Sequence, residues 1–134
     1  HCVVPRRRPF CGAGLLSARD AGNYSRLERA SLRIGTETHD YASWELRQNG
    51  RFVRQGRSDE MPMEGPDAWL RVTRNGNVFR GEVSENGEQW AALPDITVEN
   101  WKSELHAGIA AVNDTIVPFS PTFSELRLSP TGGQ

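Results

Sequence analysis

Hydrophobic and polar residues alternate in a series of short segments along the chain, and this period of two residues is typical of β-strands. The clearest pair covers residues 68–74 and 78–84, which are separated by Asn75-Gly76-Asn77. Asn-Gly is typical of a tight hairpin turn, because glycine readily adopts the positive φ that the turn needs. A second Asn-Gly at residues 86–87 turns the chain again. The pattern therefore predicts an antiparallel β-meander in this part of the chain.

The same alternation continues on both sides of the meander. Residues 41–48 and 51–55 flank Asn49-Gly50 and predict a second hairpin. Segment 24–34 also fits helical spacing, but we favour a strand because its neighbours are strands. A further strand is expected to begin at residues 90–93, after the second Asn-Gly, and residues 94–98 are expected to form a short edge segment. The remaining strands are expected over residues 10–18, 104–112 and 122–128.

Two segments carry more specific expectations. Residues 104–112 are apolar at nearly every position, which is typical of a central strand covered on both faces. Residues 35–40 are polar and are expected to form a loop.

Trp44, Trp90 and Trp101 are expected to pack in the core or at its edge, because large aromatic side chains dominate small cores. Short strands with frequent turn signals favour an antiparallel sandwich or barrel.

The 134-residue chain has the size of one domain, large enough to bury about two-thirds of its unfolded surface. We expect an irregular arm at residues 1–9, one sandwich domain at 10–129 and a tail at 130–134. Sixteen Lys and Arg against 17 Asp and Glu give a net charge of −1, which provides no electrostatic footprint for nucleic acid or an anionic membrane. No apolar run approaches the roughly 20 residues of a membrane helix, so neither nucleic acid nor a membrane is an expected partner.

The sequence gives only weak signals for the cellular compartment of the protein. Cys2 and Cys11 would close a short loop in an oxidising environment; the alternative is two unrelated thiols, because spacing alone does not fix disulfide geometry. Acceptor patterns for N-glycosylation at residues 23–25 and 113–115 give slight support to an extracellular or periplasmic location. The chain begins at His1 rather than Met, so we expect a processed chain or an excised piece.

Three stretches together carry a family resemblance. They are Ala13-Gly14-Leu15-Leu16 with residues 23–30, residues 69–72 with 84–90, and residues 107–112 with Phe119 and 123–126. In this order they resemble the concanavalin A-like, laminin-G-like jelly-roll modules, and within these an uncharacterised bacterial subgroup related to the regulation-of-enolase family. The resemblance implies an all-β antiparallel β-sandwich of the jelly-roll type over roughly residues 12–128. Such modules usually begin with further strands, so N-terminal strands are expected to be missing from the chain or supplied by another chain.

Seven aromatic or charged residues are candidates for a binding face, because those within each strand point to the same side of a sheet. They are Tyr24, Arg26, Glu28, Glu45, Arg47, Trp69 and Arg71. In the resembling jelly rolls the concave sheet face binds saccharides, which implies that the aromatics stack on sugars and the charges hydrogen-bond hydroxyl groups. The alternative is a solvated sheet face on which opposite charges form cross-strand pairs.

Catalysis and metal binding are not expected. Glycanases of the jelly-roll fold carry two glutamates on one strand as Glu-x-Asp-x-x-Glu, and this chain has no such run. No nucleophile motif accompanies the three histidines. No cofactor is therefore expected. Calcium is the one metal considered, because some laminin-G-like modules bind it, but the aspartates at 40, 59, 95 and 114 are isolated in sequence.

These observations predict a non-catalytic binding or accessory module of a larger bacterial protein, with a carbohydrate as the ligand. The alternative is a docking or assembly domain whose open sheet edge pairs with another protein chain. Glycanase activity is the least favoured function.

Overall fold

The computed structural model describes residues 2–3, 10–54, 60–65, 67–101, 104–114 and 120–129, with only the backbone described for residues 2–3. This described part consists of strands, turns and loops, and it confirms the expected all-β fold. Among the described residues, no helix is long and apolar enough to cross a membrane. The strands are β1 (Cys2–Val3), β2 (Phe10–Asp20), β3 (Asn23–Ile34), β4 (Glu37–Gln48), β5 (Arg51–Arg54), β6 (Asp67–Asn75), β7 (Val78–Ser84), β8 (Ala91–Ala92), β9 (Ile96–Thr97), β10 (His106–Asn113) and β11 (Thr122–Phe123).

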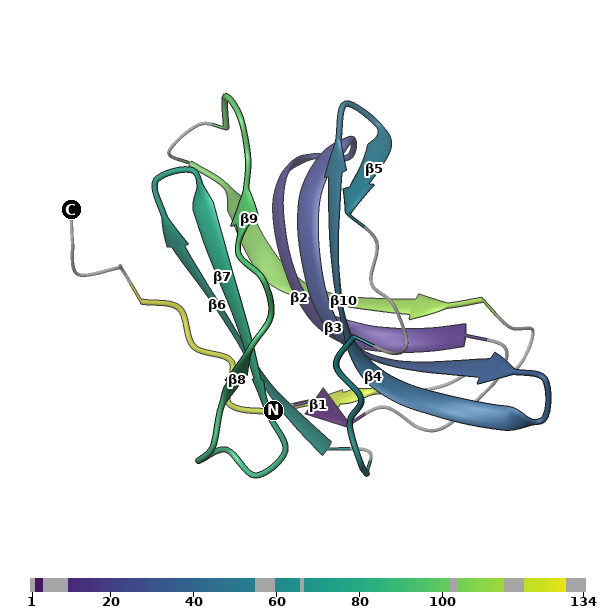
Figure 1. The fold of residues 1–134 in the computed structure, drawn as a ribbon. Coiled ribbons are helices and arrows are strands. Elements are labelled where there is room, and N and C mark those ends of the chain that lie inside the picture. Colours follow the sequence, from purple (N-terminus) through teal and green to yellow (C-terminus); the bar gives the residue numbers. More distant parts are fainter. Residues whose placement is uncertain are drawn as a thin grey trace.

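The strands form two antiparallel sheets that pack as a sandwich (Figure 1). One is five-stranded, in the order β10-β2-β3-β4-β5. The other has six strands, in the order β11-β1-β6-β7-β8, with β9 also paired to β7. The hairpins predicted at Asn49-Gly50 and Asn75-Gly76 are confirmed as β4–β5 and β6–β7, and the chain that turns at Asn86-Gly87 returns as β8, which pairs with β7. The segment with helical spacing is the strand β3.

The five-stranded sheet is sharply bent across the middle of β2, β3 and β4, and the six-stranded sheet packs against the outer side of this bend (Figure 1). Successive side chains of a strand point to opposite faces. Leu27 of β3 lies directly opposite Trp44 of β4, and both are fully buried in the core between the sheets. The residues one position away, such as Arg26 and Glu45, therefore face the inner side of the bend.

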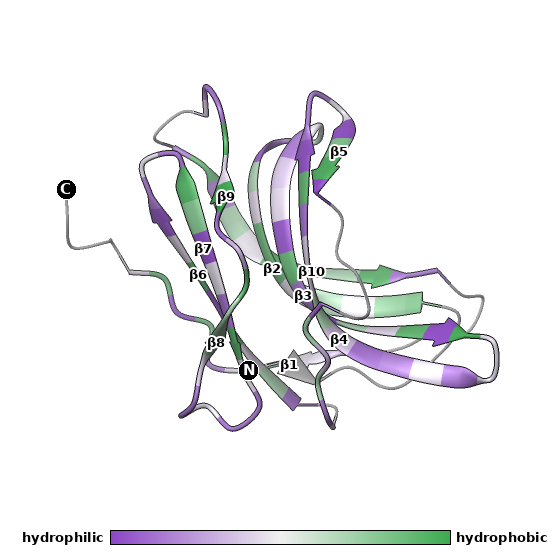
Figure 2. Ribbon diagram, viewed as in Figure 1, coloured by the Kyte–Doolittle hydropathy of each residue, from purple (hydrophilic) through white to green (hydrophobic). Residues whose placement is uncertain are grey.

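The core between the sheets is centred on Trp44. A Cβ atom at Gly81 of β7 would come within 2.3 Å of the Trp44 ring, so the absence of a side chain there lets the indole lie against the opposite sheet. The indole N–H donates to Ser25 Oγ at 2.6 Å, which satisfies the buried polar atom. Trp101 is also buried, as expected, and packs edge-on against Phe79. Figure 2 shows the hydrophobic and hydrophilic residues alternating along the strands around this core.

The expectation that residues 104–112 form a covered central strand is wrong. β10 is the edge strand of its sheet, and Ile109 is 46% exposed. The run is apolar mainly because it is rich in alanine and glycine, which present little apolar area and therefore do not require cover on both faces. Composition alone does not distinguish this situation from a buried strand.

Three other boundaries differ from the expectation. The loop predicted over residues 35–40 is a tight turn at Gly35, where φ is +62°, and β4 already begins at Glu37. Cys2–Val3, expected in an irregular arm, form β1 and pair with β6 and β11. The strand expected over residues 122–128 is limited to β11. Cys11 is buried. The Cys2–Cys11 disulfide considered from the sequence stays a prediction, because the side chain of Cys2 lies outside the described residues.

Candidate functional site

The inner side of the bent sheet brings together five of the seven predicted residues. Arg26 of β3 lies opposite Glu45 of β4, and Tyr24 lies opposite Arg47. Glu28 follows Arg26 by two positions and so points to the same side. Two further residues that the sequence analysis missed share this side, because Tyr41 lies opposite Ala30 and Phe52 of β5 lies opposite Arg47. We refer to these seven residues as the inner-face cluster: Tyr24, Arg26, Glu28, Tyr41, Glu45, Arg47 and Phe52.

Two glycines of β2 make room for the buried end of this cluster. Gly14 lies opposite Glu28, and a Cβ atom there would come within 1.9 Å of the Leu27 carbonyl oxygen. A Cβ atom at Gly12 would lie 3.0 Å from the carboxyl carbon of Glu28. Because β2 presents only hydrogens at these positions, it approaches β3 closely and the Glu28 carboxyl group lies across it.

Arg26 joins the two carboxyl groups of the cluster. Its Nε lies 3.0 Å from Glu28 Oε2, and its Nη2 donates to Glu45 Oε2 at 2.6 Å. The contact with Glu28 is an ion pair without hydrogen-bond geometry, and neither oxygen of this fully buried carboxyl group accepts a hydrogen bond. Burial raises the pKa of Glu28 to about 7, the Arg26 charge opposes this rise, and the Glu45 charge adds to it. Glu28 therefore binds its proton more tightly than an exposed glutamate does.

Tyr41 closes the buried end of the cluster. Its ring is 4% exposed, and burial together with the charges of Glu28 and Glu45 raises its pKa to about 12. The phenol therefore stays protonated at physiological pH. It can act as a hydrogen-bond donor but does not add a charge.

The other end of the cluster is open and aromatic. The guanidinium carbon of Arg47 lies 4.2 Å from the centre of the Phe52 ring and 5.7 Å from that of Tyr24, both within cation–π range. Phe52 is 47% exposed. This end of the sheet therefore presents rings with apolar faces next to a positively charged group.

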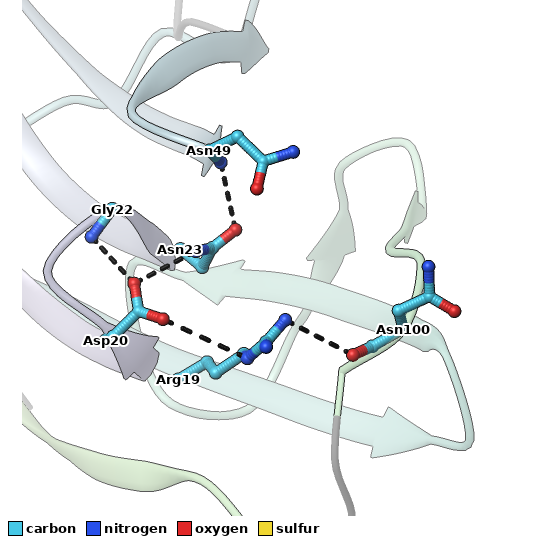
Figure 3. A network of polar contacts seen from close by, with 6 residues as sticks. All are labelled: Arg19, Asp20, Gly22, Asn23, Asn49 and Asn100. Atoms are coloured by element: carbon cyan, nitrogen blue, oxygen red, sulfur yellow. Dashed lines mark hydrogen bonds and ion pairs between the residues drawn. The ribbon is translucent and has the colours of Figure 1, made fainter.

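A polar network holds the two turns at this end of the sheet together (Figure 3). Asp20 Oδ1 accepts hydrogen bonds from Gly22 N and Asn23 Nδ2, each at 2.9 Å, and these bonds lower the pKa of Asp20. Asn23 Oδ1 in turn accepts from Asn49 N at 2.9 Å, in the turn between β4 and β5. The network fixes the β2–β3 turn against the β4–β5 turn, and so fixes the strand ends that carry the open aromatic end of the cluster.

Trp69 and Arg71 do not belong to this face. Both lie on β6 of the other sheet, on the side away from the core, since Leu70 and Val72 point into it. Arg71 is paired with Glu82 through two hydrogen bonds of 3.1 and 3.0 Å and stacks on Trp90 at 4.1 Å. Alternation shows which residues share a face within one strand, but it does not show which strands share a sheet.

The described residues contain no group of three or more His, Cys, Asp or Glu side chains that could hold a metal ion. Of the aspartates considered for calcium, Asp59 lies outside the described residues. Asp40 is a structural residue, because it forms a buried ion pair of 3.3 Å with Arg29 on the core side of the sheet.

Comparison with known proteins supports the fold. No protein-family model matches the chain, and no curated protein matches it. A crystal structure of a functionally unknown protein from Saccharomyces cerevisiae is similar, with a TM-score of 0.67 and 19% sequence identity over 92% of this chain. The chain spans 66% of the length of that protein. At this identity the likeness concerns the fold alone.

Proposed function

We propose that this protein is a non-catalytic carbohydrate-binding module and that the inner-face cluster is its binding surface. The observation that carries the proposal is the open end of the bent sheet, where the rings of Tyr24 and Phe52 flank Arg47. Aromatic faces stack on the apolar C–H surface of a sugar ring, and the edges of a guanidinium group donate hydrogen bonds to hydroxyl groups. A sheet that is concave on this side gives a bound saccharide contacts from more than one strand.

The carboxyl groups of the cluster favour binding over hydrolysis. A glycosidase needs one carboxyl group as acid and a second as nucleophile or base, both in contact with the substrate. Glu28 is fully buried, and Glu45 is buried and paired with Arg26. The raised pKa of Glu28 resembles that of a catalytic acid, but its position beneath the face supports a structural role.

The proposal predicts that binding depends on the exposed aromatic ring. A glycan array identifies the ligand, and calorimetric titration then compares Phe52→Ala with the unmodified protein. We expect Phe52→Ala to weaken binding about fivefold, because loss of one stacking ring costs on the order of 1 kcal/mol. Trp90→Ala is the matched control, because Trp90 is also stacked by an arginine, but this arginine, Arg71, lies on the other sheet. The variant is expected to leave the affinity unchanged.

Two results would count against this function. An array without any glycan signal would contradict carbohydrate binding. Release of reducing sugar from a bound glycan, abolished by Glu28→Gln, would show that the protein is a glycanase after all.

A second candidate function is docking of another protein chain, and it is favoured by the exposed edge of the sandwich. A groove of about 770 Å³ lies between β2, β10, β6 and residues 123–129. Ile109 and Leu126, which line it, are 46% and 53% exposed. β10 has no neighbour on its outer edge among the described strands, and such edges accept an added strand. A dimer in light scattering, with no glycan signal on the array, would favour this function.

A further inference from the structure

Arg47 differs from the other arginines of the described sandwich that are at least partly buried. Each of the others has a carboxylate or a backbone carbonyl oxygen as its acceptor. The pairs are Arg26 with Glu28 and Glu45, Arg29 with Asp40, Arg54 with Glu60, and Arg74 with the carbonyl oxygens of Gly76 and Trp101. Arg47 has only the two aromatic rings.

The described residues around Arg47 leave its charge without an anion. No carboxylate of the described residues lies within ion-pair distance of its guanidinium group, and its buried Nε has no hydrogen-bond partner. Glu45, the acidic residue two positions away on the same side of β4, is paired with Arg26. A partly desolvated guanidinium group without an anion is unfavourable. The folded chain therefore presents a positive group that an anionic ligand would neutralise.

We propose that Arg47 binds the carboxylate of an acidic saccharide, a hexuronic acid residue whose sugar ring stacks on Phe52. This inference rests on the proposed carbohydrate-binding function and names the class of sugar. Stacking fixes the plane of the guanidinium group. Because Nε is buried, the two Nη atoms form the edge that would meet the two oxygens of a carboxylate. Phe52, 4.2 Å from Arg47, supplies the apolar surface beside the same charge.

The rest of the inner-face cluster is compatible with an anion at this position. Glu45 is neutralised by Arg26, and between Phe10 and Ala18 the neighbouring strand β2 contributes only uncharged residues to this side, namely Phe10, Gly12, Gly14, Leu16 and Ala18. The carboxyl group of Glu28 is fully buried and forms an ion pair with Arg26. At the turn of the open end, Asp20 accepts hydrogen bonds from Gly22 and Asn23. Arg47 is therefore the charge of the inner-face cluster that has no oppositely charged partner among the described residues.

The test compares hexuronate oligosaccharides with their carboxyl-reduced counterparts, which have the same linkages but no charge. Oligogalacturonate, oligomannuronate and oligoglucuronate are the probes, and calorimetric titration is the measurement. We expect at least one hexuronate to bind about tenfold or more tightly than its reduced form, with an affinity that falls as salt is raised. Arg47→Gln is expected to weaken this binding about 10- to 100-fold and to abolish the preference.

Two further variants distinguish loss of the contact with Arg47 from a general effect of removing an arginine. Arg47→Lys keeps the charge but loses the planar two-point contact, so an intermediate affinity is expected. Arg80→Gln removes one exposed arginine from the other sheet and is expected to change nothing. Circular dichroism and the urea midpoint of each variant show whether the fold is retained.

The outcomes separate this inference from the proposed function. Equal affinity for the charged and reduced sugars, unchanged in Arg47→Gln, would overturn the role of Arg47 and leave carbohydrate binding intact. A preference for sulfated over carboxylated sugars would overturn the assignment to hexuronates. No binding in either series, with no signal on the glycan array, would remove both proposals.

Discussion

Replacing Gly14 with alanine is expected to prevent stable folding or to lower the free energy of unfolding by more than about 3 kcal/mol, beyond the usual cost of overpacking. The added Cβ would lie 1.9 Å from the carbonyl oxygen of Leu27, whereas ordinary contact begins at 3.4 Å. The obstacle is backbone, which cannot move aside as a flexible side chain can. β2 and β3 would have to separate at the bend, which breaks the hydrogen bonds between them. Urea unfolding, followed by tryptophan fluorescence, measures the effect.

Gly108→Ala is the matched control for Gly14. Gly108 lies on β10, the strand next to β2, and a Cβ atom there would meet nothing within 4 Å. Its replacement is expected to change the free energy of unfolding by no more than about 0.5 kcal/mol. Equal urea midpoints for the two variants would show that β2 and β3 are not in close contact at the bend.

Glu28→Gln is expected to stabilise the protein at pH 8 by up to about 3 kcal/mol and to flatten the dependence of its stability on pH. The pKa of Glu28 is about 7 in the folded protein and 4.5 in its ordinary state. Between these values the folded protein keeps the proton that the unfolded chain has lost, so stability falls as pH rises from 4.5 to 7 and then levels off. The difference between the two pKa values corresponds to about 3 kcal/mol. Glutamine avoids the cost because it carries no charge.

The measurement is the urea midpoint between pH 4.5 and 8.5 for the unmodified protein and the variant. Glu82→Gln is the control with the opposite sign, because the hydrogen bonds from Arg71 lower the pKa of Glu82. The contribution of Glu82 is present above its ordinary pKa and is lost only as pH falls below it, so its replacement should leave the slope above pH 5 unchanged. A Glu28→Gln variant with the same pH slope as the unmodified protein would show that Glu28 is ionised in the folded state.

The effect of Glu28 on stability is relevant to function. Glu28 is predicted to destabilise the folded protein at neutral pH, but its carboxyl group also contacts a residue of the inner-face cluster. In this structure it orients Arg26, which in turn holds Glu45 on the inner side of the sheet. The Glu28→Gln variant thus also tests whether Arg26 keeps its position without the second charge.

The sequence alone determined the local features of this protein. The Asn-Gly turns at residues 49–50 and 75–76 and the alternation around them predicted the hairpins β4–β5 and β6–β7, and the same alternation placed Tyr24, Arg26 and Glu28 on one side of one strand. These features depend on neighbouring residues in the chain, on the φ that glycine permits and on the period of two in a strand. They are therefore readable without knowledge of the fold.

Only the tertiary structure decided which strands share a sheet and what each face encounters. It placed Trp69 and Arg71 on the opposite sheet, left β10 at an edge and brought Phe52 beside Arg47. It also showed that the absence of a side chain at Gly14 leaves room for the backbone of β3 at the bend, where Glu28 is buried. The physical reason is that pairing and packing join residues distant in the chain, and an alternating pattern is equally satisfied by any neighbour that covers its apolar side.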